Sequence, residues 1–253
     1  MKTEKILKKQ SLALLSKNNW GNAIGGFFVS LLPTVLLMLI DEAISDAIKL
    51  FININTANIY YQGTVSLISL ILIIVWLFTT PIFTGYLRMC YKISKDQDYS
   101  LKDIFYYFNK EKYNKCLSLN LSIMIRILFH FIVFSIPALI FSVFFAITSN
   151  VMFLAFAIIF TLISIIATII ICIKYTIVPC VYFEDESISN NEIIKLGLSF
   201  ISDKLSDCRK LLISFIPYYL LCFFVVPLVF VIPYITVTFM NNGKWITSMY
   251  VQK

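Results

Sequence analysis

Hydrophobic residues occur in long runs along this chain, and short polar or basic segments separate the runs. A run of about 18 or more apolar residues with few charges is typical of a transmembrane helix. The first four runs predict membrane spans over about 23–40, 65–87, 117–147 and 151–173. The third run is long enough to tilt within a bilayer or to begin among the lipid headgroups.

A final apolar stretch over 211–240 is interrupted by three prolines. As one straight helix it would be about 45 Å long, against a hydrocarbon core of about 30 Å. Because proline breaks or bends helices, we predict two spans, 211–226 and 228–245, with a single kinked helix as the alternative. The chain is therefore predicted to be one all-α domain over 1–253, a polytopic transmembrane helix bundle of five to six spans.

Two of the polar segments have the pattern of amphipathic helices. Ser100 with Asp103, and Ser189 with Glu192, have the spacing of a helix-starting capping box. Apolar residues then recur at helical spacing, and their faces need cover from the bilayer interface or from the end of the bundle. We predict two cytoplasmic interfacial helices, over about 100–115 and 189–208.

Composition and charge agree with a membrane protein. The chain is 59% hydrophobic and 14% charged, whereas soluble domains have about 45–50% apolar and about 25% charged residues. Its formal net charge is +7, but the bases cluster at the ends of apolar runs, which argues against nucleic acid as a partner. Seventeen bases lie in the N-terminal arm, 88–116 and 174–210, and one lies in the two opposite loops. The positive-inside rule then predicts a multi-pass protein with a cytoplasmic N-terminus.

The sequence contains no recognisable set of catalytic or metal-binding residues. It has one histidine, and it lacks HExxH, GxSxG and a phosphate-binding glycine loop. We therefore expect no enzyme activity, no cofactor and no metal. The acidic cluster Glu184–Glu186 is interpreted as a solvated loop that begins a helix, with a metal or catalytic role as the alternative.

A polar stripe within the third span is the candidate ligand-binding site. Ser122, Arg126 and His130 follow one another at four-residue spacing and so share one helix face. Charged residues inside a span are candidates for functional sites. The alternatives are that Arg126 extends to the cytoplasmic headgroups and that His130 makes an interhelical hydrogen bond.

A second stripe, of small residues in the first span, is typical of close helix packing. An alternative role for this stripe is to line a pore. The stripe and the residues beside it are Gly21, Gly25, Gly26, Ser30 and Thr34.

Several motifs together resemble a known family. They are Asn19-Trp20-Gly21-Asn22-Ala23-Ile24, Pro81 with Gly85, the segment Ser100–Phe108, Lys174-Tyr175, and Ile232-Pro233-Tyr234-Ile235. In their order and spacing the chain resembles the uncharacterised bacterial integral membrane family called domain of unknown function nine-seven-five. That family is related to the membrane region of some glycerophosphodiester phosphodiesterases. The resemblance implies a bacterial plasma-membrane protein with six spans, both ends cytoplasmic and no established catalytic residues. The chain departs from the family by compressing the linker between its last two spans.

These observations favour a non-enzymatic accessory, immunity or envelope-maintenance component. Its expected partners are the lipid bilayer and either another membrane protein or a second copy of itself. The first alternative is a transporter or channel subunit with a polar site around Arg126 and His130. The second alternative, a membrane enzyme acting on lipid, would need a carboxylate pair or an activated cysteine, and the sequence offers neither.

Overall fold

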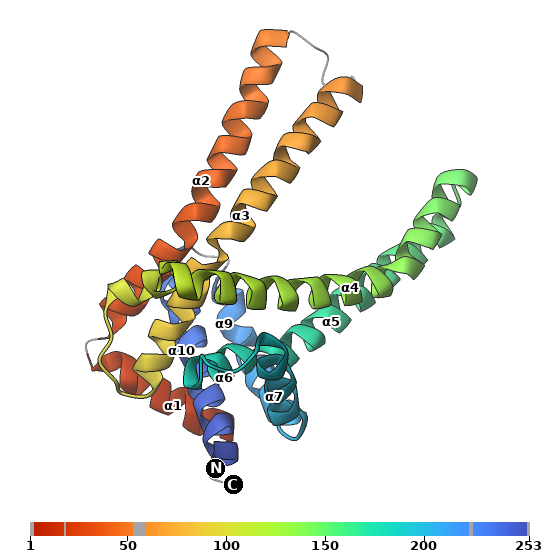
Figure 1. The fold of residues 1–253 in the computed structure, drawn as a ribbon. Coiled ribbons are helices and arrows are strands. Elements are labelled where there is room, and N and C mark those ends of the chain that lie inside the picture. Colours follow the sequence, from red (N-terminus) through yellow and green to blue (C-terminus); the bar gives the residue numbers. More distant parts are fainter. Residues whose placement is uncertain (1–2, 18, 53–58, 223–224, 252–253) are drawn as a thin grey trace.

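The computed structural model describes residues 3–17, 19–52, 59–222 and 225–251, and within these ranges every regular element is a helix. Two long antiparallel hairpins leave a common base in different directions (Figure 1). One hairpin pairs α2 (Trp20–Ile52) with α3 (Ile59–Ser94), and the other pairs α4 (Lys110–Thr148) with α5 (Val151–Tyr175). These four helices contain the first four predicted spans.

The second hairpin turns within two residues. Ser149 ends α4 in the left-handed conformation, at φ 54°. The side chain of Asn150 then accepts a hydrogen bond from the backbone N–H of Met152, at 3.0 Å, and so caps α5. A short turn of this kind forces α4 and α5 to run side by side.

Both hairpins present apolar side chains outward. Among the described residues, four helices are long and apolar enough to cross a membrane. Leu39, Phe129 and Ile147 are 57%, 64% and 74% exposed. A water-soluble protein rarely leaves so much apolar surface uncovered, and lipid provides that cover in a bilayer. These helices indicate a membrane protein.

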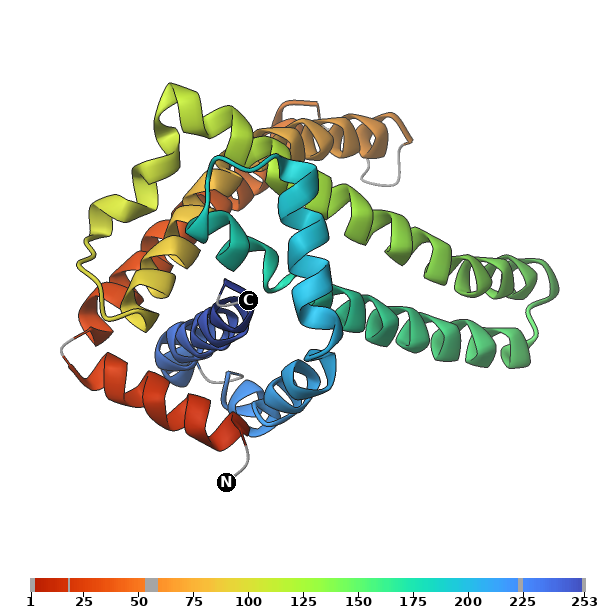
Figure 2. The ribbon, with the colours of Figure 1, turned by 60° about the horizontal axis from the view of Figure 1, so that its bottom comes forward.

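The base of the molecule is built around α10 (Val225–Val251), which lies in the middle of a ring of other helices (Figure 2). Its residues Val237 and Ile246 are fully buried. The other elements of the base are α1 (Thr3–Ser16), the 3-10 helix η1 (Leu101–Phe108), α6 (Val178–Glu184), α7 (Asn190–Ser202), α8 (Leu205–Ile213) and α9 (Ile216–Leu221). Helix α1 packs against α10 in this base.

The last apolar stretch differs from its prediction. The segment 211–226 is not one helix, because α8 ends at Ile213 and α9 begins at Ile216. Pro217 occupies the first turn of α9, where its missing N–H is tolerated, so the proline starts a new helix there. The helix predicted over 228–245 exists as α10 but forms the buried centre of the base.

The two predicted interfacial helices also differ from the structure. Leu101–Phe108 is a 3-10 helix, and α4 begins at Lys110. A 3-10 helix repeats every three residues, so Ile104 and Tyr107 are buried whereas Phe105 is exposed. The second segment divides into α7 and α8 on either side of 203–204. Both segments use part of their apolar surface to pack against the base.

Candidate functional site

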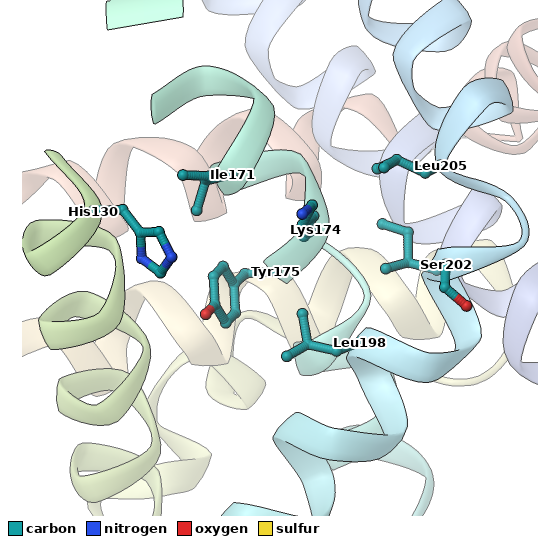
Figure 3. A pocket seen from close by; sticks show the side chains of 8 residues that line it. His130, Ile171, Lys174, Tyr175, Leu198, Ser202 and Leu205 are labelled. Carbon is teal, nitrogen blue, oxygen red and sulfur yellow. The ribbon is translucent and has the colours of Figure 1, made fainter. Parts of the chain in front are cut away.

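A cavity of about 430 Å³ lies where the second hairpin meets α7 and α8. We call it the His130 cavity. Its walls are His130 from α4, Ile171, Lys174 and Tyr175 from α5, Leu198, Ile201 and Ser202 from α7, and Leu205 from α8. Figure 3 shows these side chains around one space, with His130 and Tyr175 approaching each other from adjacent helices. The volume falls within the range of about 300–1,000 Å³ that is common for small-ligand sites.

Helix α7 is held in place at both its start and its middle. At its start the backbone N–H of Glu192 donates to Ser189 Oγ at 3.4 Å, within a complete capping box. In its middle, a Cβ added at Gly197 would lie 2.8 Å from a methyl group of Val178 on α6. Glycine therefore allows α7 to lie directly on α6, which fixes the wall of the cavity that α7 contributes.

The tautomer of His130 follows from its hydrogen bond. Its Nδ1 lies 2.6 Å from the backbone carbonyl oxygen of Arg126, one turn earlier in α4. Because a carbonyl oxygen only accepts, Nδ1 carries a hydrogen, and Nε2 is the nitrogen left for a ligand. In the neutral ring Nε2 accepts a hydrogen bond, and in the imidazolium form it donates one.

Lys174 and Tyr175 end α5 and add polar groups to the cavity. Lys174 is exposed, and it has no ion pair or hydrogen bond with any residue that the structure describes. Tyr175 is 9% exposed, and its hydroxyl likewise has no partner among the described residues. The cavity therefore offers an ammonium and a phenol hydroxyl that are both available to bind an anion.

The remaining polar wall residue does not face the same way. Ser202 donates to the carbonyl oxygen of Ser199 at 2.7 Å, and its hydroxyl points away from His130 (Figure 3). The following carboxylate, Asp203, is not part of the cavity wall. The available charge in the cavity is therefore positive.

The other two residues of the predicted polar stripe lie outside the cavity. Ser122 and Arg126 are half-buried on α4, and neither lines the His130 cavity. Arg126 contributes only its backbone carbonyl, which accepts the hydrogen bond from His130. Of the stripe, the structure brings only His130 into contact with this cavity.

The small residues of α2 differ in what they contact. A Cβ at Gly26 would overlap the end of the Met89 side chain and lie 3.0 Å from the ring of Tyr86, both on α3, so glycine favours the close approach of the two helices there. Gly25 faces η1, and Gly21 has no neighbouring atom within 4 Å in the described structure. Ser30 and Thr34 line a second cavity, between α2, α3 and α4, which also reaches Tyr175 at the end of α5.

The acidic cluster after α6 is more than a solvated loop. Glu186 pairs with Arg88, and Glu184 pairs with Lys95 at 2.6 Å, so both carboxylates bind α3. Only Asp185 between them is free of α3, and hydrogen bonds from Ser187 lower the pKa of its carboxyl group. The described residues contain no group of three His, Cys, Asp or Glu that could hold a metal. The cluster instead ties the α6–α7 connection to the first hairpin.

Sequence reasoning did not select Lys174 and Tyr175 as site residues. The available signal was the position of Lys174, the base that ends the fourth apolar run, close to His130 if the two spans form a tight hairpin. Comparison with known proteins adds no further assignment: no family model, curated protein or solved structure matches this chain.

Proposed function

We propose that this chain is a non-enzymatic membrane protein that binds an anionic lipid headgroup in the His130 cavity. The observation that carries the proposal is that Lys174 and Tyr175, whose ammonium and hydroxyl have no partner among the described residues, line the same cavity. Basic pockets between membrane helices on the cytoplasmic side are typical binding sites for phosphate-bearing lipids. Lipid binding of this kind would suit an accessory, immunity or envelope-maintenance component of a bacterial plasma membrane.

The geometry favours lipid binding over a transport path. The apolar part of the wall, with Ile171, Leu198 and Leu205, suits the first carbons of lipid chains. A transport site around Arg126 and His130 would need both side chains at one cavity, and Arg126 does not line it. The proposal therefore uses His130 but not Arg126.

Replacing Lys174 by glutamine is expected to weaken anionic-lipid binding about fivefold, because one lysine near a charged membrane surface contributes about 1 kcal/mol. The measurement is native mass spectrometry of protein released from nanodiscs that contain phosphatidylglycerol, cardiolipin and phosphatidylcholine. The occupancy of each lipid is compared between the parent chain and Lys174→Gln.

The matched control is Lys195→Gln. Lys195 is an exposed base on α7 that lies outside the cavity wall, so this change removes the same charge without touching the site. Equal losses in the two variants would mean that net charge alone attracts the lipid, and the proposed site would be rejected. A loss confined to Lys174→Gln supports it.

The orientation predicted from basic residues belongs to the same proposal. With the termini at the cytoplasmic base, Lys174 would face the anionic inner leaflet. We expect a fluorescent protein fused to the N-terminus to fluoresce in cells, and alkaline phosphatase inserted between α2 and α3 to be active. Phosphatase that is active at the N-terminus and inactive between α2 and α3 would reverse the orientation.

A further inference from the structure

The first hairpin carries a second concave surface, whose inner end touches Tyr175 of the His130 cavity. Two adjoining cavities, of about 340 and 420 Å³, share Thr34 and Trp76 in their walls. The outer one reaches Asp41 and Ser69. The inner one is lined by the hydroxyl and amide side chains of Ser30, Thr79, Thr80, Thr84 and Asn120, among apolar residues. We call the pair the hairpin groove.

Hydrogen bonds across the hairpin hold the groove in shape. Trp76 Nε1 donates to Thr34 Oγ1 at 3.0 Å, where the two cavities meet. Ser69 Oγ donates to Asp41 Oδ1 at 3.0 Å, at the outer end. From Ser69 to Thr84 the groove follows α3 for about 22 Å at helical rise, which is most of a hydrocarbon core of about 30 Å.

The polar atoms of the groove mainly accept hydrogen bonds. The hydroxyls of Thr79 and Thr80 donate to carbonyl oxygens of their own helix, at 2.7 and 2.8 Å. Asn120 Nδ2 donates to Thr80 Oγ1 at 3.4 Å and to Thr84 Oγ1 at 2.9 Å, so a ligand meets the lone pairs that remain on these hydroxyls. The groove thus suits a ligand that supplies hydrogen-bond donors.

Asp41 makes the outer end specific for positive charge. It is half-buried, and within the described structure no lysine, arginine or histidine pairs with it. Its neighbour Glu42 is exposed, and Asp46 pairs with Lys49 at 2.8 Å. A carboxylate at the edge of an apolar groove is stabilised by a nearby cation. Because no described residue supplies that cation to Asp41, a positively charged ligand could do so.

We infer that the hairpin groove binds an amine-bearing lipid, with its ammonium on Asp41 and Ser69 and one hydrocarbon chain along the groove past Trp76. A primary ammonium supplies three donors, which match the carboxylate and hydroxyl oxygens. Asp41 is 21 residues after Trp20, about 32 Å along α2 at helical rise, so it lies at headgroup depth on the side opposite the base. Met38 and Ile73, which line the outer cavity, are 66% and 55% exposed, which places the groove against lipid.

The test uses nanodiscs with equal phosphatidylethanolamine and phosphatidylcholine, which differ in whether the ammonium carries N–H donors. Native mass spectrometry of the full chain is expected to show about fivefold enrichment of phosphatidylethanolamine, the ratio that roughly 1 kcal/mol gives. Asp41→Asn, which keeps the shape of the side chain, is expected to abolish the enrichment. Leu72→Trp, which fills the outer cavity and leaves Asp41 in place, is expected to abolish it as well.

Controls separate this site from charge effects and from the anionic site. Glu42→Gln removes a neighbouring exposed carboxylate, and Lys174→Gln alters the other cavity, so both are expected to keep the enrichment. Equal binding of the two lipids by the parent chain, or equal losses in Asp41→Asn and Glu42→Gln, would overturn the inference. Free ethanolamine that displaced the lipid at matched concentration would also overturn it, because the hydrocarbon groove would then add nothing.

Discussion

Replacing Gly85 by alanine is expected to destabilise the protein by about 3 kcal/mol, at the upper end of the usual overpacking range. A Cβ at this position would overlap the backbone carbonyl oxygen of Ile104, and it would lie 2.6 Å from the carbonyl carbon and 2.8 Å from the Cα. These are backbone atoms of η1, so no side-chain rotation can relieve the collision. The variant must move η1 away from α3.

That displacement would uncover part of the core of the base. Ile104 is fully buried in the cluster that includes Met89 and Cys90 of α3, and Tyr107 on the same 3-10 helix is fully buried against α6. Unfolding by sodium dodecyl sulfate in mixed micelles, followed by tryptophan fluorescence, measures the loss. An unfolding free energy equal to that of the parent would contradict the contact between Gly85 and η1.

Gly21→Ala is the matched control, since it makes the same substitution in another long helix. A Cβ at Gly21 meets no atom within 4 Å of it in the described structure. Alanine is about 0.5–1 kcal/mol more favourable than glycine inside a helix, so the control is expected to be unchanged or slightly more stable. If the unfolding free energy falls in Gly85→Ala and rises in Gly21→Ala, the effect comes from the contact at Gly85 and not from helix propensity.

Local pattern was sufficient to predict the two hairpins. The apolar runs over 23–40 and 117–147 lie inside α2 and α4, because the length and composition of a span are properties of consecutive residues. The helices continue beyond their runs: α4 already begins at Lys110, since polar residues extend a helix into the headgroup region and the base. The boundaries of the apolar runs therefore underestimate the lengths of the helices.

The base could not be predicted in the same way, because contacts between distant residues decide its structure. The pattern over 228–245 resembles a span, yet α10 is enclosed by helices from both ends of the chain. Asn241 lies 3.4 Å from Ser11 Oγ, across 230 residues of sequence. The 3-10 form of η1 could not be predicted either, since the capping box at Ser100 indicates a helix start but not its pitch.

Part of the candidate site could be predicted from the local pattern of residues along the chain. His130 belonged to the polar stripe predicted in the third span, and the cavity includes it. Arg126 has the same spacing pattern but lies outside the cavity, because a stripe on one helix does not determine which neighbour faces each residue. Lys174 joins His130 only through the pairing of α4 with α5, which the tight turn at Ser149 produces.

Glu186→Gln is expected to lower the unfolding free energy by about 2–3 kcal/mol, because it leaves two cations without their shared anion. Glu186 pairs with Arg88 and, at 3.4 Å, with Lys112 of α4. The guanidinium of Arg88 also lies 3.4 Å above the ring of Tyr106. The Arg88 and Glu186 side chains are 17% and 25% exposed, so the effect is expected to fall below that of a fully buried pair and above that of a surface pair.

Arg88→Met is expected to destabilise less than Glu186→Gln, by about 1–2 kcal/mol, because Lys112 still pairs with Glu186 after the change. The double variant tests the coupling between the two residues: its loss of unfolding free energy should be smaller than the sum of the single losses by about 1 kcal/mol or more.

Lys17→Met is the control. Lys17 and Asp96 form an ion pair at 2.7 Å, and their side chains are 57% and 59% exposed. Such surface pairs contribute about 0–1 kcal/mol. Additive losses for Arg88→Met and Glu186→Gln would mean that the connection after α6 is not held to α3 by this pair. Non-additive losses would show that the Arg88–Glu186 ion pair, whose two residues are 98 apart in sequence, links the first hairpin to the helices that build the His130 cavity.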